Sequence, residues 1–366
     1  MKRAGNLIER IVDAENLRRA YLRAVAGKRD KPETLRFREN LDANLAAIGR
    51  ELAQGRYRWG AFSRFKIFDP KEREIAVAPF RDRVAHHAII GVCEPIFERR
   101  QIDQSFACRK GKGQSAAVAL AQRYSRGARY YLKMDVRKYF ASIDRETLKR
   151  SLFRLFKDEI LLKALCDAVD VYEPGAERGI PIGSLTSQFF ANHYLTPLDR
   201  FIKERLKSRR YLRYMDDFVL WDDDRDALAR RRDEIERFAA EELRLTFKES
   251  ALNLTSKGLT FLGTRVFPGR VRLASRSRLR FRRKHAELTE RFRQGLATET
   301  EYAERTRALF AFVERAESRA FRLRVMQTGD DAEGLEPSVA RRRLEQQRQE
   351  LPVGQPERQR PGESEQ

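Results

Sequence analysis

Apolar residues recur at helical spacing over much of the chain. Residues 7 to about 55 predict two helices separated by a turn that contains Gly27 and Pro32. The second helix has one apolar face, formed by Leu41, Leu45, Ile48 and Leu52. The same periodicity, with its flanking turn residues, predicts four more helices. They cover about residues 82–97, 145–156, 183–195 and 226–243.

Short runs of aromatic and β-branched residues predict strands between these helices. The runs cover residues 62–68, 74–77, 130–136 and 211–221. A charged turn joins the first two, which suggests a basic β-hairpin. We therefore expect both helices and strands along the chain.

Two adjacent carboxylates, Asp216 and Asp217, interrupt the last of these runs. Burying such a pair is costly and the two charges repel each other, so we expect an exposed hairpin turn or a bound divalent cation. A third carboxylate, Asp135, lies near the end of the strand at 130–136, and Asp144 is expected to cap the following helix. This set suits two Mg²⁺ ions, with Mn²⁺ as the alternative, that promote phosphoryl transfer.

The net charge changes the picture of the binding partner. The chain has a formal charge of +22, whereas residues 328–366 contain six Arg and nine Asp or Glu, a net of −3. The remainder therefore carries +25. Such an excess alone suits a nucleic acid and a merely well-solvated surface equally; together with the carboxylate motifs it favours a nucleic acid.

Cysteine usage and the N-terminus bear on location. The three cysteines, Cys93, Cys108 and Cys166, are widely spaced, which argues against a disulfide framework or a zinc site. The first residues contain no apolar signal region, and no apolar run approaches the length of a membrane span. We therefore expect a cytoplasmic protein without membrane association.

At these residues the chain resembles a reverse transcriptase. Tyr214-Met215-Asp216-Asp217 and the segment around Asp135 look like the two metal-binding motifs of the palm. Three further segments resemble the finger motifs and the primer-grip turn: residues 79–84, 105–113 and 258–263. The resemblance covers roughly residues 30–325 and implies an α+β fold, a right-hand polymerase with an antiparallel palm sheet. Its expected parts are an N-terminal helical extension (1–55), fingers (56–128), palm (129–265), helical thumb (266–327) and a disordered tail (328–366).

The resemblance assigns roles to individual residues. Asp135, Asp216 and Asp217, with the main-chain carbonyl of Val136, would hold the metal ions. Lys248 would protonate the departing pyrophosphate. Phe140 matches the steric gate that excludes a ribose 2′-OH, although packing in the core is its alternative role. Arg73 matches the fingertip arginine that contacts the triphosphate of the incoming nucleotide.

Two basic clusters are candidate nucleic-acid contacts. The first consists of Arg109, Lys110 and Lys112, expected to meet template or triphosphate. The second is formed by Arg278, Arg280, Arg282 and Arg283, interleaved with Leu and Phe. It would grip the backbone of a template–primer duplex without reading its sequence, but an ordinary charged helix start remains the alternative.

One further motif narrows the resemblance. Ile182-Gly183 and Ser187-Gln188 stand where most reverse transcriptases have Gln-Gly and Ser-Pro, and are similar to the enzymes of diversity-generating retroelements. The resemblance implies adenine-mutagenic cDNA synthesis from a template-repeat RNA, with Ile182, Gly183 and Gln188 beside the nucleotide. The implied partners are template RNA, the cDNA or primer, dNTPs and a small basic accessory protein. The alternatives are a retron, group II intron-like or antiphage-defence reverse transcriptase, or a catalytically silent RNA-binding scaffold.

Overall fold

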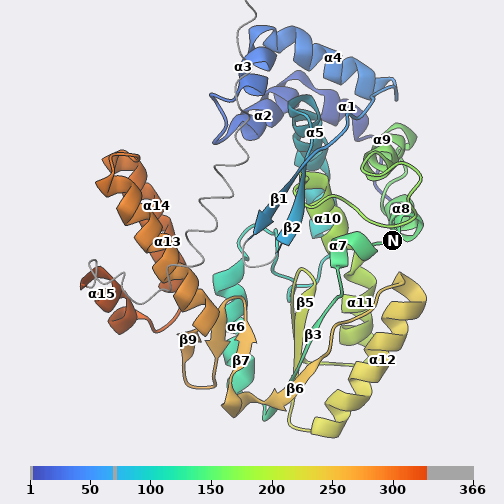
Figure 1. Cartoon of the computed structure of the whole chain (residues 1–366). Coiled ribbons are helices and arrows are strands. Elements are labelled where there is room, and N and C mark those ends of the chain that lie inside the picture. Colours follow the sequence, from blue (N-terminus) through green and yellow to red (C-terminus); the bar gives the residue numbers. More distant parts are fainter. Residues whose placement is uncertain (1–2, 69–71, 328–366) are drawn as a thin grey trace, which may run out of the picture. The chain divides into compact units, whose positions relative to one another are not determined.

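The structure is a computed structural model that describes residues 3–68 and 72–327 (Figure 1). The expected disordered tail at 328–366 lies outside the described residues. The chain divides into two compact units, Met1–Ala274 and Ser275–Gln366. Helices and antiparallel sheets are combined along the chain, which confirms the predicted α+β fold.

The N-terminal region contains four helices, so the prediction of two is wrong. The first predicted helix breaks at Asp13, whose extended backbone lets its carboxylate accept a hydrogen bond from Asn16 N at 3.1 Å. The second breaks at Asn40, where φ −125° and ψ 47° are not helical. The helices are α1 (Ile8–Val12), α2 (Ala14–Val25), α3 (Pro32–Glu39) and α4 (Leu41–Ala53).

A hairpin and two helices follow. Strands β1 (Ser63–Phe68) and β2 (Glu72–Val77) pair antiparallel, as predicted. Helix α5 (Phe80–Glu98) is apolar over most of its surface and packs against α2. A helix that the sequence reasoning did not anticipate, α6 (Gln114–Arg126), leads into the central sheet.

The central sheet of the first unit has four antiparallel strands in the order β4-β5-β3-β6 (Figure 1). The strands are β3 (Tyr130–Asp135), β4 (Arg210–Tyr214), β5 (Asp217–Asp222) and β6 (Ala251–Leu254). The interior positions of β5 are buried throughout, because helix α12 (Arg225–Leu243) packs on β3 and β5. The antiparallel sheet expected for the palm is therefore present.

Helices between β3 and β4 cover the sheet and complete the core. The Asp144 carboxylate accepts from Thr147 N at 2.8 Å and caps α8, as predicted. The helices are α7 (Tyr139–Ser142), α8 (Arg145–Leu155), α9 (Glu159–Asp170), α10 (Leu185–Tyr194) and α11 (Thr196–Arg200), which continues as a π-helix over Phe201–Arg205.

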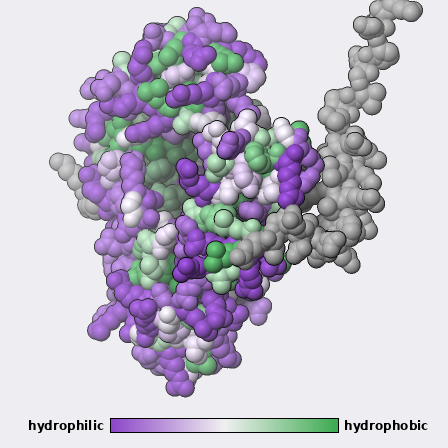
Figure 2. All heavy atoms as spheres, turned by 90° about the vertical axis from the view of Figure 1, so that its left-hand side faces the viewer, coloured by the Kyte–Doolittle hydropathy of each residue, from purple (hydrophilic) through white to green (hydrophobic). Residues whose placement is uncertain are grey.

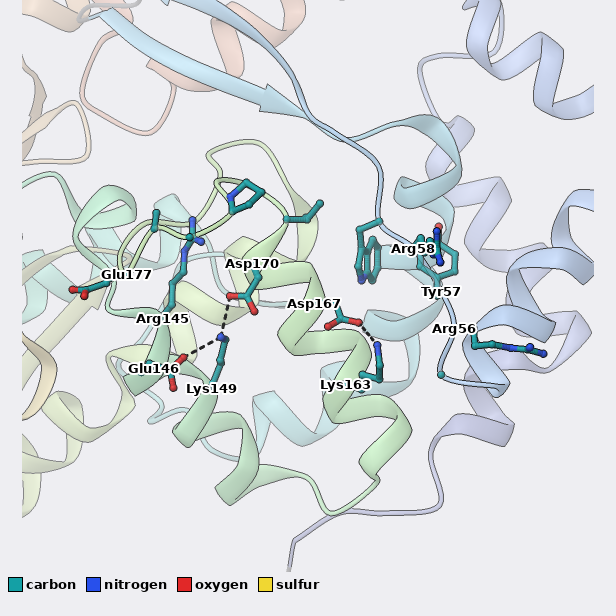
Figure 3. Close-up of a pocket in the computed structure, with 16 residues that line it drawn as sticks. Arg56, Tyr57, Arg58, Arg145, Glu146, Lys149, Lys163, Asp167, Asp170 and Glu177 are labelled. Atoms are coloured by element: carbon teal, nitrogen blue, oxygen red, sulfur yellow. Dashed lines mark hydrogen bonds and ion pairs between the residues drawn. The ribbon is translucent and has the colours of Figure 1, made fainter.

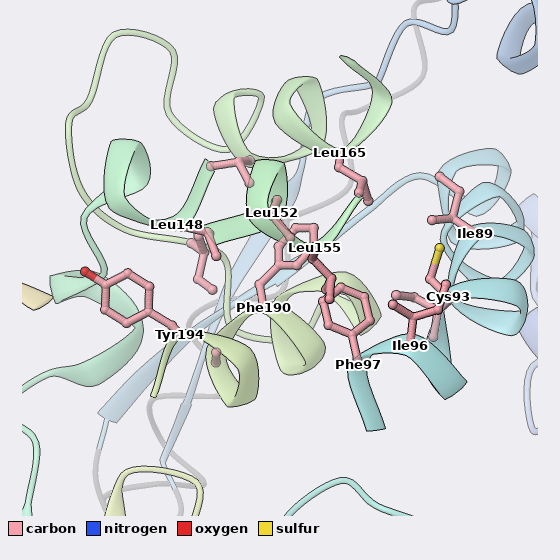
Figure 4. Packing of buried hydrophobic residues seen from close by; sticks show 14 of the residues in the cluster. Ile89, Cys93, Ile96, Phe97, Leu148, Leu152, Leu155, Leu165, Phe190 and Tyr194 are labelled. Carbon is pink, nitrogen blue, oxygen red and sulfur yellow. The ribbon is translucent and has the colours of Figure 1, made fainter. Parts of the chain in front are cut away.

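The hydrophobic core joins helices that are distant in sequence. Figure 4 shows Phe97 of α5, Leu152 of α8, Leu165 of α9 and Phe190 of α10 around one interior. Each is almost inaccessible to solvent. Burial of one such side chain contributes about 1.5–3 kcal/mol to the stability of the fold. This packing therefore holds the four helices in fixed positions.

A small antiparallel sheet ends the first unit. Its strands are β7 (Leu259–Phe261), β8 (Thr264–Val266) and β9 (Val271–Leu273). Leu262 and Gly263 both have positive φ in the turn between β7 and β8, which is the turn expected from the primer-grip motif. Strand β9 lies where the sequence reasoning expected mainly helix.

The second unit is helical in its described part. It contains α13 (Ser275–Arg293), α14 (Glu299–Val313) and α15 (Arg319–Gln327). Thr298 and Glu301 form a capping box at the start of α14. Phe281, Phe310 and Phe321 pack ring against ring and hold the three helices together.

The protein surface is strongly polar. Hydrophilic side chains cover most of the face that Figure 2 shows, and hydrophobic ones lie in small separate patches. None of the helices in the part of the chain that the structure describes is both long and apolar enough to cross a bilayer.

Candidate active site

The three candidate metal-binding carboxylates lie at one end of the central sheet. Asp135, the last residue of β3, stands opposite Asp217, the first residue of β5. Val136 N donates to the Asp216 carbonyl at 3.2 Å and extends this pairing across the turn. Met215 takes a left-handed conformation (φ 56°), which makes the turn between β4 and β5 tight. The structure thus brings together the strand end and the hairpin turn that the sequence separates by about 80 residues.

The negative charges of these carboxylates lie close together, and Asp216 and Asp217 are largely shielded from water. Burial raises the pKa of Asp217 to about 7, and Asp135 and Asp216 add to the rise although Lys133 opposes it. Burial also raises the pKa of Asp216, with Asp135 adding to the effect. A site that raises carboxylate pKa values in this way favours the binding of a compensating cation.

Two lysines already face the carboxylates. Lys133 Nζ lies 3.1 Å from Asp217 Oδ2, and Lys248 Nζ is hydrogen-bonded to Asp135 Oδ1. The main chain places Lys248 beside the site, because Lys248 N donates to the Asp135 carbonyl at 2.9 Å. Lys248, expected near the departing pyrophosphate, is therefore adjacent to the carboxylate set.

The donor set has the right chemistry for a hard divalent cation. Asp217 Oδ1 is buried without a hydrogen-bond partner in the structure, which leaves one carboxylate oxygen available as a ligand. Within residues 3–68 and 72–327, however, no three His, Cys, Asp or Glu side chains are already arranged around a common point where a metal ion could bind. Asp135 and Asp217 would have to turn from Lys248 and Lys133 to share an ion.

Phe140, five residues after Asp135 in the chain, is less deeply buried than its neighbour Tyr139. Tyr139 is 3% exposed, and its hydroxyl donates to the Ala191 carbonyl at 2.5 Å. Phe140 is only partly buried, with its ring 5.8 Å from that of Tyr139. Tyr139 therefore fills the inward position, and Phe140 packs against the outside of the core, so its role as a gate stays a prediction.

The Ile182–Gly183 segment is tied to the β1–β2 hairpin. Ala76 N donates to the Ile182 carbonyl at 2.8 Å. A Cβ at Gly183 would lie 2.8 Å from the Ala76 carbonyl oxygen, and Gly183 has φ 114°, so both space and conformation require glycine there. The Ile182 and Gln188 side chains are half-buried, the latter on α10.

Arg73 lies on β2 of the same hairpin, opposite Ile67. Its positive charge lowers the pKa of Asp216 against the upward effect of burial, so Arg73 lies within electrostatic range of the carboxylates. Arg73 is therefore near enough to the carboxylates to act on Asp216, and its contact with a triphosphate stays a prediction.

The first basic cluster is less available than its sequence suggests. The Arg109 side chain is 6% exposed and forms a forked ion pair with Glu98, with distances of 2.6–2.9 Å. It also donates to the carbonyls of Ile102 and Ser105. This geometry gives Arg109 a structural role in its loop, and its expected nucleic-acid contact stays a prediction. The other two cluster members, Lys110 and Lys112, remain on the surface.

The four arginines of the second cluster lie on α13, in the second unit. Arg280 and Arg282 stack over Phe312 and Phe321 at 5.5 and 5.8 Å from the ring centroids, and Arg283 pairs with Glu287. Cation–π contacts keep the guanidinium charge while fixing its position.

A buried polar network behind the β4–β5 turn escaped the sequence reasoning. Arg213 of β4 is completely buried and forms a two-pronged ion pair with Asp199, at 2.7 Å from Nε and 2.6 Å from Nη2. Tyr211 donates to the same carboxylate at 2.7 Å. An arginine at an interior position of an apolar strand was the available signal, because a buried charge requires a buried partner.

Comparison with known proteins agrees with this architecture. The family model described as "Reverse transcriptase (RNA-dependent DNA polymerase)" matches residues 69–266, more than half of the chain. The chain is 22% identical over 212 residues to the putative COX1/OXI3 intron 1 protein of Saccharomyces cerevisiae, covering 55% of this chain and 25% of that protein. It is 25% identical over 142 residues to nuclear intron maturase 2, mitochondrial, of Arabidopsis thaliana, covering 34% and 19%. The chain thus spans a quarter or less of the length of these relatives.

The solved structures to which the chain is similar include telomerases. Telomerase from Candida albicans, in complex with a TWJ fragment of telomeric RNA, gives a TM-score of 0.49 at 10% identity and covers 75% of this chain and 58% of that one. Apo telomerase from Candida tropicalis, truncated of its C-terminal domain, gives 0.46 at 13% identity and covers 58% and 55%. The family match covers the segment that carries the central sheet, strand β2 of the hairpin and the three carboxylates, and the chain belongs to the reverse transcriptase family, whose right-hand polymerase fold it shares.

Proposed function

We propose that this protein is an RNA-directed DNA polymerase whose active site is built on Asp135, Asp216 and Asp217. One observation carries the proposal: Asp135 and Asp217 are paired residues at one sheet end, with Asp216 joined to Val136 across the turn. Members of the family can lose activity, but a silent scaffold would not need three neighbouring carboxylates whose burial is costly.

Asp135, Asp216 and Asp217, with the Val136 carbonyl, would hold two Mg²⁺ ions, for which Mn²⁺ can substitute. When bound, such ions stabilise the attacking and leaving oxygens of an in-line phosphoryl displacement. The unpartnered Asp217 Oδ1 and the raised carboxylate pKa values support this assignment.

Neighbouring residues would handle the nucleotide. Arg73 offers a planar fork of donors to the triphosphate, and the partly exposed Phe140 ring excludes a ribose 2′-OH by its bulk. Lys248, already hydrogen-bonded to Asp135, holds a proton that it can give to departing pyrophosphate.

The positive net charge of the chain and the proteins to which it is similar both support an RNA template. The formal net charge of +22 and the arginines of α13 suit the binding of a phosphate backbone. The relatives include an intron maturase, and the similar structures include a telomerase bound to RNA.

Within this family we propose the diversity-generating type. Ile182-Gly183 and Ser187-Gln188 support it, because Ile182 offers apolar bulk where a Gln would offer a hydrogen bond. The proposal includes adenine-directed errors and a small basic accessory protein joined to the enzyme through RNA. The maturase relatives favour a second candidate, an intron-associated protein that binds RNA with or without cDNA synthesis.

Extension of a DNA primer on a defined RNA template, with dNTPs and Mg²⁺, tests the proposal. The purified protein should produce full-length cDNA, and sequencing should show substitutions concentrated at template adenines. Accurate cDNA would remove the diversity-generating assignment, and RNA binding without extension would favour the scaffold.

A further inference from the structure

A cavity in the first unit contains none of the residues assigned above. It has a volume of ≈ 900 Å³. Its walls are the segment after α4 (residues 55–59), the facing sides of α8 and α9, and the loop at 171–177. Figure 3 shows Arg145 and Lys149 on one side of it and Arg56, Arg58 and Lys163 on the other.

The charges that line this cavity do not cancel. Five cationic and four acidic side chains line it. Lys149 is paired with Asp170 and Glu146 at 2.9 and 3.0 Å, and Lys163 is paired with Asp167 at 2.6 Å. The remaining cations are Arg56, Arg58 and Arg145, and none of them forms an ion pair with a carboxylate in the described part of the chain.

Arg145 is the unusual member of this group. It is 2% exposed, and its Nε and Nη1 donate to the carbonyls of Gly179 and Glu173 at 2.8 and 2.7 Å. Its Nη2 is buried without a hydrogen-bond partner in the structure. Asp170 and Glu173 lie within electrostatic range of this guanidinium, but neither forms an ion pair with it in the described part of the chain. Leaving a buried donor such as Nη2 unsatisfied is costly, so an additional acceptor, such as an anion, would stabilise it.

The loop over Arg145 could adjust to such an anion. Gly175 has φ 80°, and a Cβ built there would find no atom within 4 Å, so the loop tip is not packed. The same loop is held to the β1–β2 hairpin, because Arg64 donates to the Tyr172 carbonyl at 3.0 Å and pairs with Glu173. An occupant of the cavity would therefore contact a loop that also supports the hairpin carrying Arg73.

We propose that this cavity binds the phosphate backbone of a nucleic-acid strand, with Arg58 and Arg145 as the principal recognition residues on its two sides. Guanidinium groups suit phosphate because their donors match its oxygens in pairs. The proposal rests on the proposed RNA substrate for its choice of a strand over free phosphate. It adds a contact outside the polymerase centre.

Binding of a 12-nucleotide single-stranded RNA, measured by fluorescence anisotropy in EDTA without dNTPs, tests this site. Arg58→Gln should weaken binding about 5- to 10-fold and lower the salt dependence by about one released counterion. Arg145→Gln should give a similar loss. Arg230→Gln, which removes an exposed arginine on α12, is the matched control and should bind as wild type. Unchanged affinity and salt dependence in Arg58→Gln would overturn the proposal, whether or not Arg145→Gln folds.

Two further measurements are needed. One distinguishes an RNA strand from free phosphate as the ligand of the cavity, and the other distinguishes failure of this inference from failure of the proposed polymerase function. Hydrogen exchange of the wild type should slow over residues 171–177 with RNA but not with millimolar inorganic phosphate; protection by phosphate alone would point to a small-molecule site and overturn the strand assignment. Because no divalent ion or dNTP is present, loss of polymerase activity cannot mimic the result. A protein that extends primers while Arg58→Gln binds RNA normally would refute this inference alone.

Discussion

Arg213 Nη1 donates a hydrogen bond to the main-chain carbonyl of Met215 at 3.0 Å. Met215 is the left-handed residue of the turn that presents Asp216 and Asp217. Arg213 is itself fixed by Asp199, so a fully buried ion pair anchors the turn from behind. The position of the two carboxylates therefore depends on a residue that does not reach the solvent.

Replacing Arg213 with Lys should impair catalysis more than folding. Lysine keeps the charge but cannot bond Asp199 and Met215 together through a planar fork. We expect kcat for primer extension to fall at least about 10-fold, equal to ~1.4 kcal/mol, with a smaller change in KM for dNTP. Arg210→Lys on the same strand, where the pair with Asp223 is exposed, is the control. Equal kcat values in both variants would mean that Arg213 does not position the turn.

Phe140→Ala should relax sugar selection. The ring would act by bulk alone, so its removal should raise ribonucleotide incorporation relative to deoxynucleotide without large loss of DNA synthesis. Single-nucleotide extension with matched rNTP and dNTP measures the ratio. Tyr139→Phe, which removes only the buried hydroxyl, should leave selection unchanged. Unaltered discrimination in Phe140→Ala would assign that ring to packing.

Acid should destabilise the first unit through two buried histidines. Burial lowers the pKa of His86 to about 3 and that of His193 to about 4. At a pH below 6.5, the ordinary pKa of histidine, both histidines bind protons in the unfolded chain but stay neutral in the folded protein. Each therefore contributes stability that is complete above pH 6.5 and is lost on acidification, by on the order of 1.4 kcal/mol per pH unit.

His86→Gln isolates this effect. His86 stacks on Trp59 and lies near Ser184, so Gln keeps a polar group without a titrating ring. The free energy of unfolding, measured with urea between pH 6.5 and 4.5, should depend less steeply on pH than in the wild type. The difference in slope should correspond to about one proton fewer bound on unfolding. Asp217, whose pKa is raised, acts in the opposite direction in both proteins and cancels in the comparison. Parallel pH profiles would contradict a neutral buried His86.

Ile182→Gln should lower the error rate without abolishing synthesis. A restored hydrogen bond is worth about 0.5–1.5 kcal/mol, or several-fold in selectivity, so Arg73 and other residues must share in any strong mutagenesis. Sequencing of cDNA made by both forms on one adenine-containing template measures the spectrum. Identical spectra would leave Ile182 as a packing residue beside Ala76.

Local signals explain what the sequence could reveal. The runs of aromatic and β-branched residues, the Asp144 cap and the apolar face of α4 depend on neighbours in the chain, and each agrees with the structure. The break at Asp13 was missed because a single capping carboxylate overrides a continuous apolar period. The roles of Arg109 and Arg213 depend on Glu98 and Asp199, which are separated from them by turns whose course the sequence does not specify. The Arg145 cavity likewise forms only when three distant segments meet.

The central claim is that the carboxylates at the end of β3 and β5 carry out DNA synthesis, and Asp216→Asn tests it most directly. The matched control is Asp233→Asn, an exposed position on α12. With Mg²⁺ and an RNA template, Asp216→Asn should give no detectable cDNA, because the amide lacks the charge needed to hold a cation. Its RNA affinity should remain near that of wild type, since dispersed arginines and lysines supply it. Asp233→Asn should extend the primer normally. Wild-type extension by Asp216→Asn would contradict the proposed active site.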